Sequence, residues 1–396
     1  MRMFKAVILA SLLLFSTSTY STAAAPTSFS FTGAGYGHGV GMSQIGAKAH
    51  ALAGESATAI LNYYYKDVTV IPVVDTQTIR VNIGHLLSTL SLQTITPDST
   101  LTLFPGEIGT SQEIQPVATY GLRQKLSVRL QGNNLVAGSL TSKVLTVRWN
   151  GPNAIVSMTS LGKSVKYRYG QIQIKVVKGA LEVTNSLSLH DEYLWGISEM
   201  SSAWPGAALE AQVIASRSYA LSKLGTLKPS CDCNVYSHIA DQNFVGYSKE
   251  IEPKIGSLWK AAVIRTNIDS STSLAILAGG KPIQAYYFSS SGGATQTTKD
   301  AWGEVSSYTQ SVADPASADI KLNPRFAHWS ASADQALVAA AFLLSDIVTL
   351  EIISRNSAGA VTYIKGTSSD GSTKLLRGDT FRSRVKIPSP YFQLTP

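Results

Sequence analysis

The feature that most constrains the fold is a change of hydrophobic pattern near residue 188. Across residues 67–187, valine, isoleucine and threonine alternate with polar residues, and breaks rich in glycine, asparagine, aspartate and proline separate the runs. Alternation with a period of two is typical of strands that bury one face. Residues 188–224 instead carry apolar residues at helical spacing, interrupted at Pro205. The sequence therefore predicts an α+β protein in which an antiparallel β-rich domain precedes a mixed region of helices and strands.

The same patterns predict the remaining elements and the organisation of the chain. Strands are expected at 78–83, 143–149, 171–177, 273–278, 282–288, 347–353 and 361–364, and helices at 42–53, 57–65, 189–224 with a new helix starting at Pro205, 259–266 and 333–344. Five units follow: 1–25 as a signal peptide, 26–66 as a glycine-rich block with two helices, 67–187 as the β-rich domain, 188–315 as the mixed region, and 316–396 as a C-terminal α/β extension.

The first 25 residues have the features of a secretory signal. Arg2 and Lys5 precede an apolar run from Ala6 to Phe15, and small residues at Ala23–Ala25 suit cleavage. The run is too short for a stable membrane span and ends in serine and threonine, which disfavours an N-terminal anchor. We therefore expect an exported protein, secreted or held in the cell wall, with no membrane span after cleavage.

The charge of the chain is modestly positive. Loss of Arg2 and Lys5 with the signal would lower the formal charge from +8 to +6. A basic protein attracts anionic polymers, and cell-wall polymers fit this charge as well as nucleic acid does. The chain has no run of lysine or arginine and no RNA-binding signature, so a nucleic-acid partner is not expected. Ordinary surface charge is the alternative interpretation.

The strongest candidate for chemistry is Glu199, within the segment from Tyr193 to Pro205. Apolar and aromatic neighbours desolvate a carboxyl group and raise its pKa, so that it holds a proton near neutral pH. A general acid that acts on a glycosidic oxygen needs this property. The alternative is a surface glutamate at a helix end, the commonest place for this residue. Asp191 and Glu192, about two helical turns earlier, could supply the second acid of a paired-carboxylate glycosidase, but Asp191 is interpreted as a helix cap. If no partner exists, a single-acid mechanism is indicated.

Other polar residues are candidates to assist Glu199. Arg217 lies beside the apolar face of its predicted helix, where an arginine is often held by a carboxylate or a ligand; a surface cation is the alternative. His38, in a glycine-rich run followed by Ser43 and Gln44, is suited to hydrogen bonding sugar hydroxyls, or is a turn histidine. The run lacks the Lys-Ser/Thr ending of a phosphate-binding loop, which disfavours a nucleotide site.

Two further groups have more than one interpretation. Cys231, Cys233 and His238 are suitable zinc ligands, but the cysteine spacing is not that of a standard zinc knuckle, and a disulfide is the alternative in an oxidising compartment. No other cofactor is required. A serine run before Gly292-Gly293 lacks the Gly-x-Ser-x-Gly pattern of a nucleophile, so it is interpreted as polar ligands to substrate or backbone; the run is Ser289, Ser290 and Ser291.

Four blocks of the sequence, at 35–65, 193–200, 204–220 and 282–293, carry a resemblance to one family. Together they resemble the SpoIID/LytB family, the stage II sporulation protein D-like group of cell-wall proteins. The resemblance covers roughly residues 33–315 and implies that 188–315 is a SpoIID-like catalytic region. In many sporulation members the glycine-rich block closes the chain, whereas here it opens it. The site then requires this block to pack back against Glu199.

The resemblance implies a peptidoglycan lytic transglycosylase. Such an enzyme cleaves glycan strands, in some members strands stripped of stem peptides, between N-acetylmuramic acid (MurNAc) and N-acetylglucosamine (GlcNAc) and leaves 1,6-anhydro-MurNAc ends. The family's catalytic glutamate falls on Glu199, which would act as both acid and base. Its helix arginine falls on Arg217, which would hold Glu199 or a sugar carboxylate. Tyr286, Tyr287 and the three serines are expected to line the groove.

Two alternatives to catalysis remain at this point. The family also implies a non-catalytic wall-binding protein that enhances a partner amidase or autolysin, using the same groove for binding only. A structural scaffold of the cell envelope is the third, and it predicts no saccharide binding. Cleavage that depends on Glu199 separates the first hypothesis from both alternatives.

Overall fold

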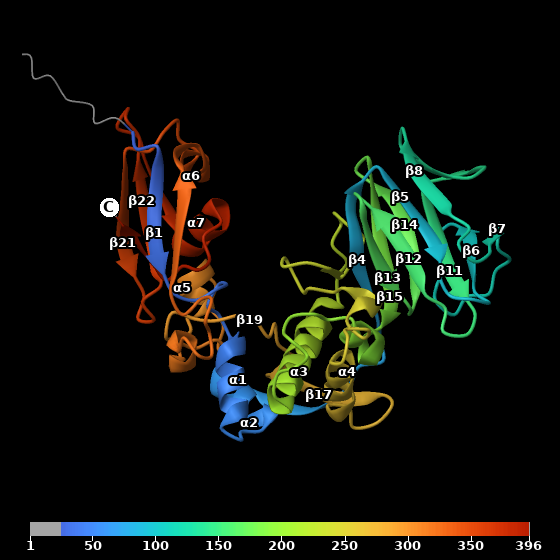
Figure 1. The fold of residues 1–396 in the computed structure, drawn as a ribbon, viewed down its shortest axis with the longest axis horizontal. Coiled ribbons are helices and arrows are strands. Elements are labelled where there is room, and N and C mark those ends of the chain that lie inside the picture. The colour runs from blue at the N-terminus through green and yellow to red at the C-terminus, as the bar shows by residue number, and fades with distance from the viewer. Residues whose placement is uncertain (1–24, 396) are drawn as a thin grey trace, which may run out of the picture.

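The computed structural model describes residues 25–395, which form three parts in an open V (Figure 1). The sandwich lobe (residues 76–188) forms one arm, and the C-terminal lobe (28–33 and 329–395) forms the other. The helical base (36–75 and 189–328) joins them. The predicted signal peptide lies outside the described residues apart from Ala25. Among the helices of residues 25–395, none has the length and apolarity needed to cross a bilayer.

The sandwich lobe consists of two sheets that share one hydrophobic core. Their strand orders are β16-β4-β15-β14-β11-β6-β7 and β10-β9-β8-β5-β12-β13, and the helical base contributes the edge strand β16. The period of two explains the arrangement: in β5, Leu90 and Leu92 are buried while Thr89 faces outward. The bounds are β4 (Thr78–Leu87), β5 (Thr89–Thr94), β6 (Thr100–Pro105), β7 (Ala118–Tyr120), β8 (Leu126–Gln131), β9 (Asn134–Ala137), β10 (Leu140–Ser142), β11 (Val144–Asn150), β12 (Val156–Ser160), β13 (Lys163–Tyr167), β14 (Gln171–Val177), β15 (Ala180–Ser188) and β16 (Val235–Tyr236).

The helical base is built around α3 (Gly206–Lys223), which is buried on most sides because α1, α2, α4 and β17 all pack on it. Small residues such as Ala211 and Ala215 let these neighbours approach closely. The other elements are η1 (Leu189–Tyr193), η2 (Gly246–Ser248), η3 (Pro315–Ala318), α1 (Gln44–Leu52), α2 (Ala57–Tyr64), α4 (Gly256–Arg265), α5 (Thr298–Trp302), β2 (Met42–Ser43), β3 (Thr69–Val74), β17 (Thr272–Ala278), β18 (Lys281–Pro282) and β19 (Tyr287–Phe288).

The C-terminal lobe has a separate core and recruits the first strand of the described chain. The strand β1 lies between β20 and β24, antiparallel to both. Phe31 of β1 packs against Phe381 and Phe392 with ring centroids 5.8 and 5.7 Å away. The bounds are β1 (Ser28–Gly33), β20 (Trp329–Asp334), α6 (Gln335–Phe342), β21 (Thr349–Arg355), β22 (Val361–Thr367), β23 (Thr373–Arg377), α7 (Gly378–Val385) and β24 (Phe392–Thr395).

The structure confirms the predicted α+β class, with several antiparallel sheets. It differs from the sequence analysis in three local respects. The strand expected at 282–288 is reduced to two short strands, β18 and β19, separated by residues that belong to no strand. Helix is not continuous from residue 189 to 224: η1 is a short π-helix, and Glu199 lies in the loop between it and α3. The strand β3 pairs with β17 of the base rather than with the sandwich. A pairing across about 200 residues leaves no local pattern in the sequence.

Candidate functional site

Glu199 lies in a loop that is joined to a second loop. Ile197 forms a β-bridge with Phe244, and the N–H of Ser198 donates to the carbonyl of Asn243 at 2.8 Å. The side-chain amide of Asn243 donates back to the carbonyl of Ser198 at 2.6 Å. These hydrogen bonds pair the backbone N–H and carbonyl groups of Ser198 and the carbonyl of Asn243, which lie outside any helix or sheet. They fix the position of the Glu199 backbone between η1 and α3.

The two carboxyl oxygens of Glu199 have different surroundings. Oε1 accepts hydrogen bonds from the backbone N–H of Asn243 at 2.7 Å and from the hydroxyl of Tyr287 at 3.0 Å. No described residue donates a hydrogen bond to Oε2. Burial raises the pKa of Glu199, and this effect exceeds the opposing influence of the two hydrogen bonds on its pKa. The group is therefore suited to carry a proton, and Oε2 is the oxygen free to carry it.

A row of hydrogen bonds orients the hydroxyl of Tyr287. The side-chain amide of Gln242 donates to the Tyr287 oxygen at 2.9 Å. The oxygen of Gln242 in turn accepts from the hydroxyl of Tyr193 at 2.7 Å. Because the Tyr287 oxygen already accepts from Gln242, its own proton is directed to Glu199. Gln242 and Asn243 are adjacent in the chain, so one short segment supports Glu199 from two directions.

The glycine-rich block packs against Glu199. Met42 and Ser43 of β2 pair in parallel with β19, which contains Tyr287. The side chain of Gln44 donates to the backbone carbonyl of Glu199 at 3.1 Å and to Gln212 of α3 at 3.1 Å. Gly41 has φ +78°, and a Cβ there would collide with the carbonyl oxygen of Tyr286. The glycine-rich block opens the chain but still packs against Glu199, as the sequence analysis required for a complete site.

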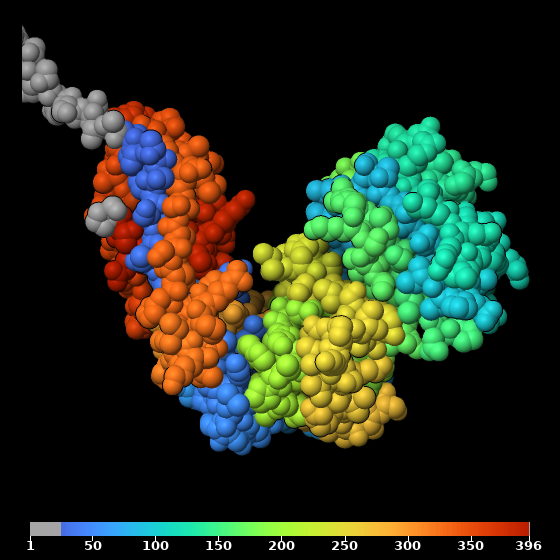
Figure 2. Space-filling model, viewed as in Figure 1, coloured from blue at the N-terminus to red at the C-terminus, as the bar shows by residue number. Residues whose placement is uncertain are grey.

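Glu199 opens into a cleft of about 630 Å³ that is lined by the helical base and by Arg382 of the C-terminal lobe. Figure 2 shows the surface hollowed between the C-terminal lobe and the rest of the molecule. Aromatic rings line much of it, and Tyr286 meets Trp302 edge to face with centroids 4.9 Å apart. The aromatic lining residues are Tyr36, Tyr219, Tyr286, Tyr287, Phe288, Trp302 and Phe326. Rings of this kind offer flat apolar surfaces to the faces of sugar rings.

His38 is one of the predicted residues that do line the cleft. Its Nδ1 accepts from the backbone N–H of Val40 at 3.0 Å, which requires a neutral ring with the proton on Nε2. Burial lowers the pKa of His38 to about 4, in keeping with the neutral form. The ring packs against Trp302 with centroids 5.2 Å apart. His38 is thus placed to donate a hydrogen bond to a neutral or anionic group.

Gln44, Tyr286, Tyr287 and Ser289 also line the cleft, whereas the other predicted serines do not. Ser43 is buried and caps α1, its Oγ accepting from the N–H of Gly46 at 3.1 Å. Ser290 is fully buried. Ser291 is also buried and donates to Asp314 at 2.7 Å. The predictions that Ser43, Ser290 and Ser291 contact substrate are therefore wrong in this structure, because these side chains serve the packing behind the cleft wall.

Arg217 does not lie in the cleft. Its guanidinium is fully buried and forms an ion pair with Asp75, with 2.8 Å between Nε and Oδ2. It also donates to Thr266 at 2.9 Å and to Asn267 at 2.9 Å. A buried guanidinium needs such partners because desolvation is costly, and burial lowers its pKa to about 10. The prediction that Arg217 holds Glu199 or a sugar is corrected: it joins α3 to the loops around it.

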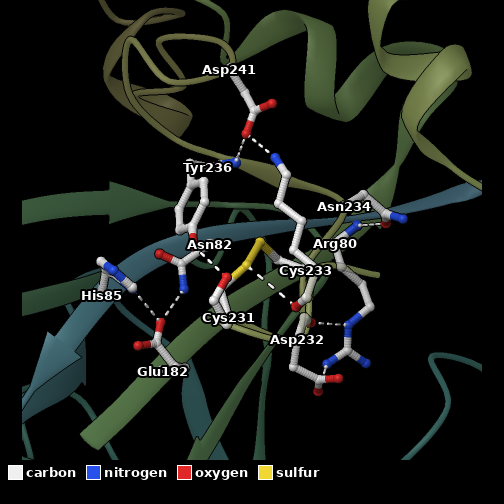
Figure 3. The surroundings of a disulfide bond; sticks show 12 residues. Arg80, Asn82, His85, Glu182, Cys231, Asp232, Cys233, Asn234, Tyr236 and Asp241 are labelled. Carbon is white, nitrogen blue, oxygen red and sulfur yellow. Dashed lines mark hydrogen bonds and ion pairs between the residues drawn. A yellow bond between two sulfur atoms is a disulfide. The ribbon is translucent and has the colours of Figure 1, made fainter. Parts of the chain in front are cut away.

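Cys231 and Cys233 form a disulfide, shown in Figure 3. Disulfide sulfurs are not the thiolates that bind zinc, and His238 stacks on the ring of Tyr236. Within residues 25–395, no cluster of three or more His, Cys, Asp or Glu is arranged to hold a metal ion. The zinc interpretation of Cys231, Cys233 and His238 is therefore replaced by the disulfide alternative.

The disulfide belongs to a segment that is anchored to the sandwich lobe (Figure 3). Arg80 of β4 forms an ion pair with Asp232 at 2.6 Å, and its backbone N–H donates to Asn234 at 2.9 Å. The strand β16 then pairs with β4 before the chain reaches Asp241. The segment that supports Glu199 is thus fixed at its start by covalent, ionic and backbone bonds.

Asp241 is a second carboxylate in the cleft, a position that the sequence analysis did not assign to it. One oxygen accepts from the hydroxyl of Tyr219 at 2.8 Å. The other accepts from the N–H of Tyr236 at 2.8 Å and pairs with Lys228. Asp241, Gln242 and Asn243 lie in an irregular loop, where no periodicity indicates which side chains face a site. Their run of three polar residues was the one available signal.

Comparison with protein families identifies the domain that contains Glu199. Residues 177–271 match the family model SpoIID, described as stage II sporulation protein. The chain contains a SpoIID domain. Proteins of this family remodel the cell wall. The matched residues include Glu199, Asp241 and Asn243, while Gln44 and Tyr287, which bond to Glu199, lie outside them. A search of curated proteins gave no match to the chain.

Proposed function

We propose that this SpoIID protein is an exported peptidoglycan lytic transglycosylase, with Glu199 as its general acid and base. The observation that carries the proposal is the state of Glu199: a carboxyl group with a raised pKa and one unbonded oxygen, at an aromatic-lined cleft. The substrate is the MurNAc-GlcNAc glycan strand, whose sugar rings suit the aromatic walls. The family match supports a cell-wall substrate.

The reaction begins with the protonated carboxyl. Oε2 of Glu199 donates its proton to the oxygen of the bond between MurNAc and GlcNAc, and the GlcNAc hydroxyl leaves as positive charge grows at the MurNAc anomeric carbon. During this step the N–H of Asn243 and the hydroxyl of Tyr287 stabilise the developing carboxylate through Oε1.

The same carboxylate then acts as the base. It takes the proton from the C6 hydroxyl of MurNAc, whose oxygen attacks the anomeric carbon and closes the 1,6-anhydro ring. The proton gained equals the proton given, so Glu199 is regenerated and no water is consumed.

The hydrogen bonds of Asp241 favour this mechanism, which uses one carboxyl group, over hydrolysis by two carboxylates. A hydrolase uses a pair of free carboxyl groups roughly 5 to 10 Å apart, the second as nucleophile or base. Asp241 is engaged with Tyr219, Tyr236 and Lys228 through both oxygens. It is therefore poorly placed to attack a sugar or to activate a water molecule.

The test compares Glu199→Gln with the matched variant Glu210→Gln, which changes a glutamate on α3 that pairs with Arg265. Both variants and the wild type are incubated with purified peptidoglycan, intact and stripped of stem peptides, and release of soluble fragments is measured. General acid–base catalysis contributes about 100-fold or more, so Glu199→Gln should lose at least that much activity. Glu210→Gln should cleave at the wild-type rate.

Two outcomes would contradict the proposal. Equal cleavage by Glu199→Gln and the wild type would remove Glu199 from the chemistry. Binding of glycan without cleavage by the wild type, on either substrate, would favour the wall-binding protein that enhances an amidase.

A further inference from the structure

The outer face of the six-stranded sheet in the sandwich lobe has no partner within the described chain. The inner residues of β5, β8 and β12, such as Leu92, Val128 and Met158, belong to the sandwich core. The alternate residues point away from that core and are exposed or partly exposed. This face lies in the arm of the V opposite the C-terminal lobe (Figure 1).

The register of this sheet places a row of hydroxyl groups across four strands. Ser127 of β8 lies opposite Ser91 of β5, Ser91 lies opposite Thr159 of β12, and Thr159 lies opposite Ser164 of β13. Neighbouring strands are about 4.8 Å apart, so the hydroxyls repeat at that spacing. Thr159 and Ser164 are close enough to share a hydrogen bond, at 2.7 Å. Two residues further along these strands, Gln93 of β5 and Ser157 of β12 form the next row of outward-facing side chains.

Cations flank the hydroxyl row. Arg129 lies on the outer face of β8, Lys125 precedes that strand with the same orientation, and Lys166 lies on β13 opposite Ser157. All three are exposed, and none forms an ion pair with a described acidic residue. The six strands of this sheet contain no aspartate or glutamate. The face is therefore cationic and carries no carboxylate on its strands to repel an anion.

A shallow groove of about 540 Å³ runs over part of the same face. Lys125, Ser127 and Arg129 line one part of it, and Thr159 and Leu161 line another. Aromatic surfaces are missing: the one aromatic residue in the six strands, Tyr167, is buried. The face thus lacks the rings on which sugars stack, in contrast to the Glu199 cleft, and offers cations and hydroxyls instead.

We propose that this face binds an anionic polymer of polyols joined by phosphodiesters. Lys125, Arg129 and Lys166 pair with successive phosphates, and the serine and threonine row hydrogen bonds the polyol hydroxyls between them. Such binding would hold the enzyme on the wall independently of its glycan substrate. The proposal does not depend on the role of Glu199, since the two sites share no residue.

The test measures binding of the full mature chain to fluorescent poly(glycerol phosphate). The triple variant Lys125→Gln, Arg129→Gln, Lys166→Gln removes the cations of the face. The control variant Lys254→Gln, Lys281→Gln, Lys321→Gln removes three exposed lysines elsewhere and gives the same net charge. Three exposed ion pairs together alter Kd by about tenfold, so the first variant should bind about ten times more weakly. The control should stay within about twofold of the wild type.

A second variant tests the hydroxyl row without removing a cation. Ser91→Glu places a negative charge in the middle of the row and should weaken binding about as much as the triple variant. Thermal unfolding of each of these variants should match the wild type, because all the substituted side chains are exposed or partly exposed. Glu199→Gln should bind the polymer as the wild type does.

Three results would overturn the proposal. Equal weakening by both triple variants would show attraction by net charge alone. Failure of the wild type to bind poly(glycerol phosphate) would remove the ligand class. If uncharged oligosaccharides of N-acetylglucosamine bind this face as tightly and their binding is lost with the same variant, the face recognises sugars rather than phosphodiesters.

Discussion

At the scale of single residues, the proposed chemistry rests on the contrast between the two oxygens of Glu199. Two donors hold Oε1, and burial of the whole group outweighs them in setting its pKa. The hydrogen bond from Tyr287 therefore limits how far the pKa rises. A variant that lacks the Tyr287 hydroxyl therefore shows in which direction this hydrogen bond shifts the pKa of Glu199.

Tyr287→Phe should shift the alkaline limb of the pH–rate profile to higher pH. The hydroxyl bonds to the ionised form of Glu199 and lowers its pKa, so its loss raises the pKa and the acid stays protonated at higher pH. Glycan cleavage measured across pH checks this. Tyr286→Phe is the control, since its hydroxyl bonds to Gln284 instead. An alkaline limb that stays in place or moves to lower pH would contradict the assigned role.

His38 gives a prediction about stability. Burial lowers its pKa to about 4, whereas an unfolded histidine titrates near 6.5, so the unfolded chain binds more protons between these values. The free energy of unfolding should therefore fall by about 2 to 3 kcal/mol as pH drops from about 6.5 to about 4 on account of this residue. In His38→Gln this part of the pH dependence should vanish in denaturant titrations. It should persist in His328→Gln, which changes an exposed histidine.

At the scale of elements, the segment from Cys231 to Asn243 links the sandwich lobe to the site. Its start is fixed by the disulfide and Arg80, and its end supports Glu199. The disulfide closes a very short loop, for which the loss of chain entropy in the unfolded state amounts to about 1.5 kcal/mol.

Replacing Cys231 and Cys233 together with serine should lower the free energy of unfolding by about that amount, roughly 1.5 kcal/mol, in denaturant titrations. Glycan cleavage should also decrease, because Asn243 is held less firmly. Reduction of the wild type with a thiol should reproduce both effects and leave the double variant unchanged. Unaltered stability and activity after both treatments would show that Arg80 and β16 fix the segment without the disulfide.

The elements show what local sequence can and cannot reveal. The strands near residues 78, 144 and 171 and the helices α1, α2 and α3 follow from periodicity, because one buried face imposes it. Glu199 was found from its apolar neighbours. Its partners Asn243 and Tyr287 were not assigned to it, because they lie 44 and 88 residues away in the chain and no local pattern links them to Glu199. The role of Arg217 was misjudged because its counterion, Asp75, lies far earlier in the chain.

At the scale of the whole molecule, the cleft depends on two separate cores. The cluster of the sandwich and the cluster that joins α1, α2 and β17 both include residues of α3, so together they form one body. The C-terminal lobe has a cluster of its own, built around Phe31, Phe342, Phe381 and Phe392. Arg382 of α7 nevertheless lines the cleft with Glu199. Loss of the smaller core should therefore remove one wall of the site while Glu199 stays in place.

Phe381→Ala tests this arrangement. Truncating a fully buried phenylalanine costs about 3 to 5 kcal/mol, so one of two unfolding transitions should move to lower temperature in calorimetry. Val128→Ala, in the sandwich core, should move the other transition. Phe381→Ala should also reduce glycan cleavage at temperatures above the unfolding transition of the C-terminal lobe. A single transition displaced as a whole by either variant would show that the lobes unfold together.

The most direct test of the central claim is the mass of the sugar ends that this protein produces from purified glycan strands. An enzyme in which Glu199 serves as both acid and base uses no water, so every new MurNAc end should be the 1,6-anhydro form, one water lighter than a reducing end. These ends should disappear with Glu199→Gln. Reducing MurNAc ends that incorporate labelled oxygen from water would contradict the account, because they require a hydrolytic mechanism that the engaged carboxylate of Asp241 does not support.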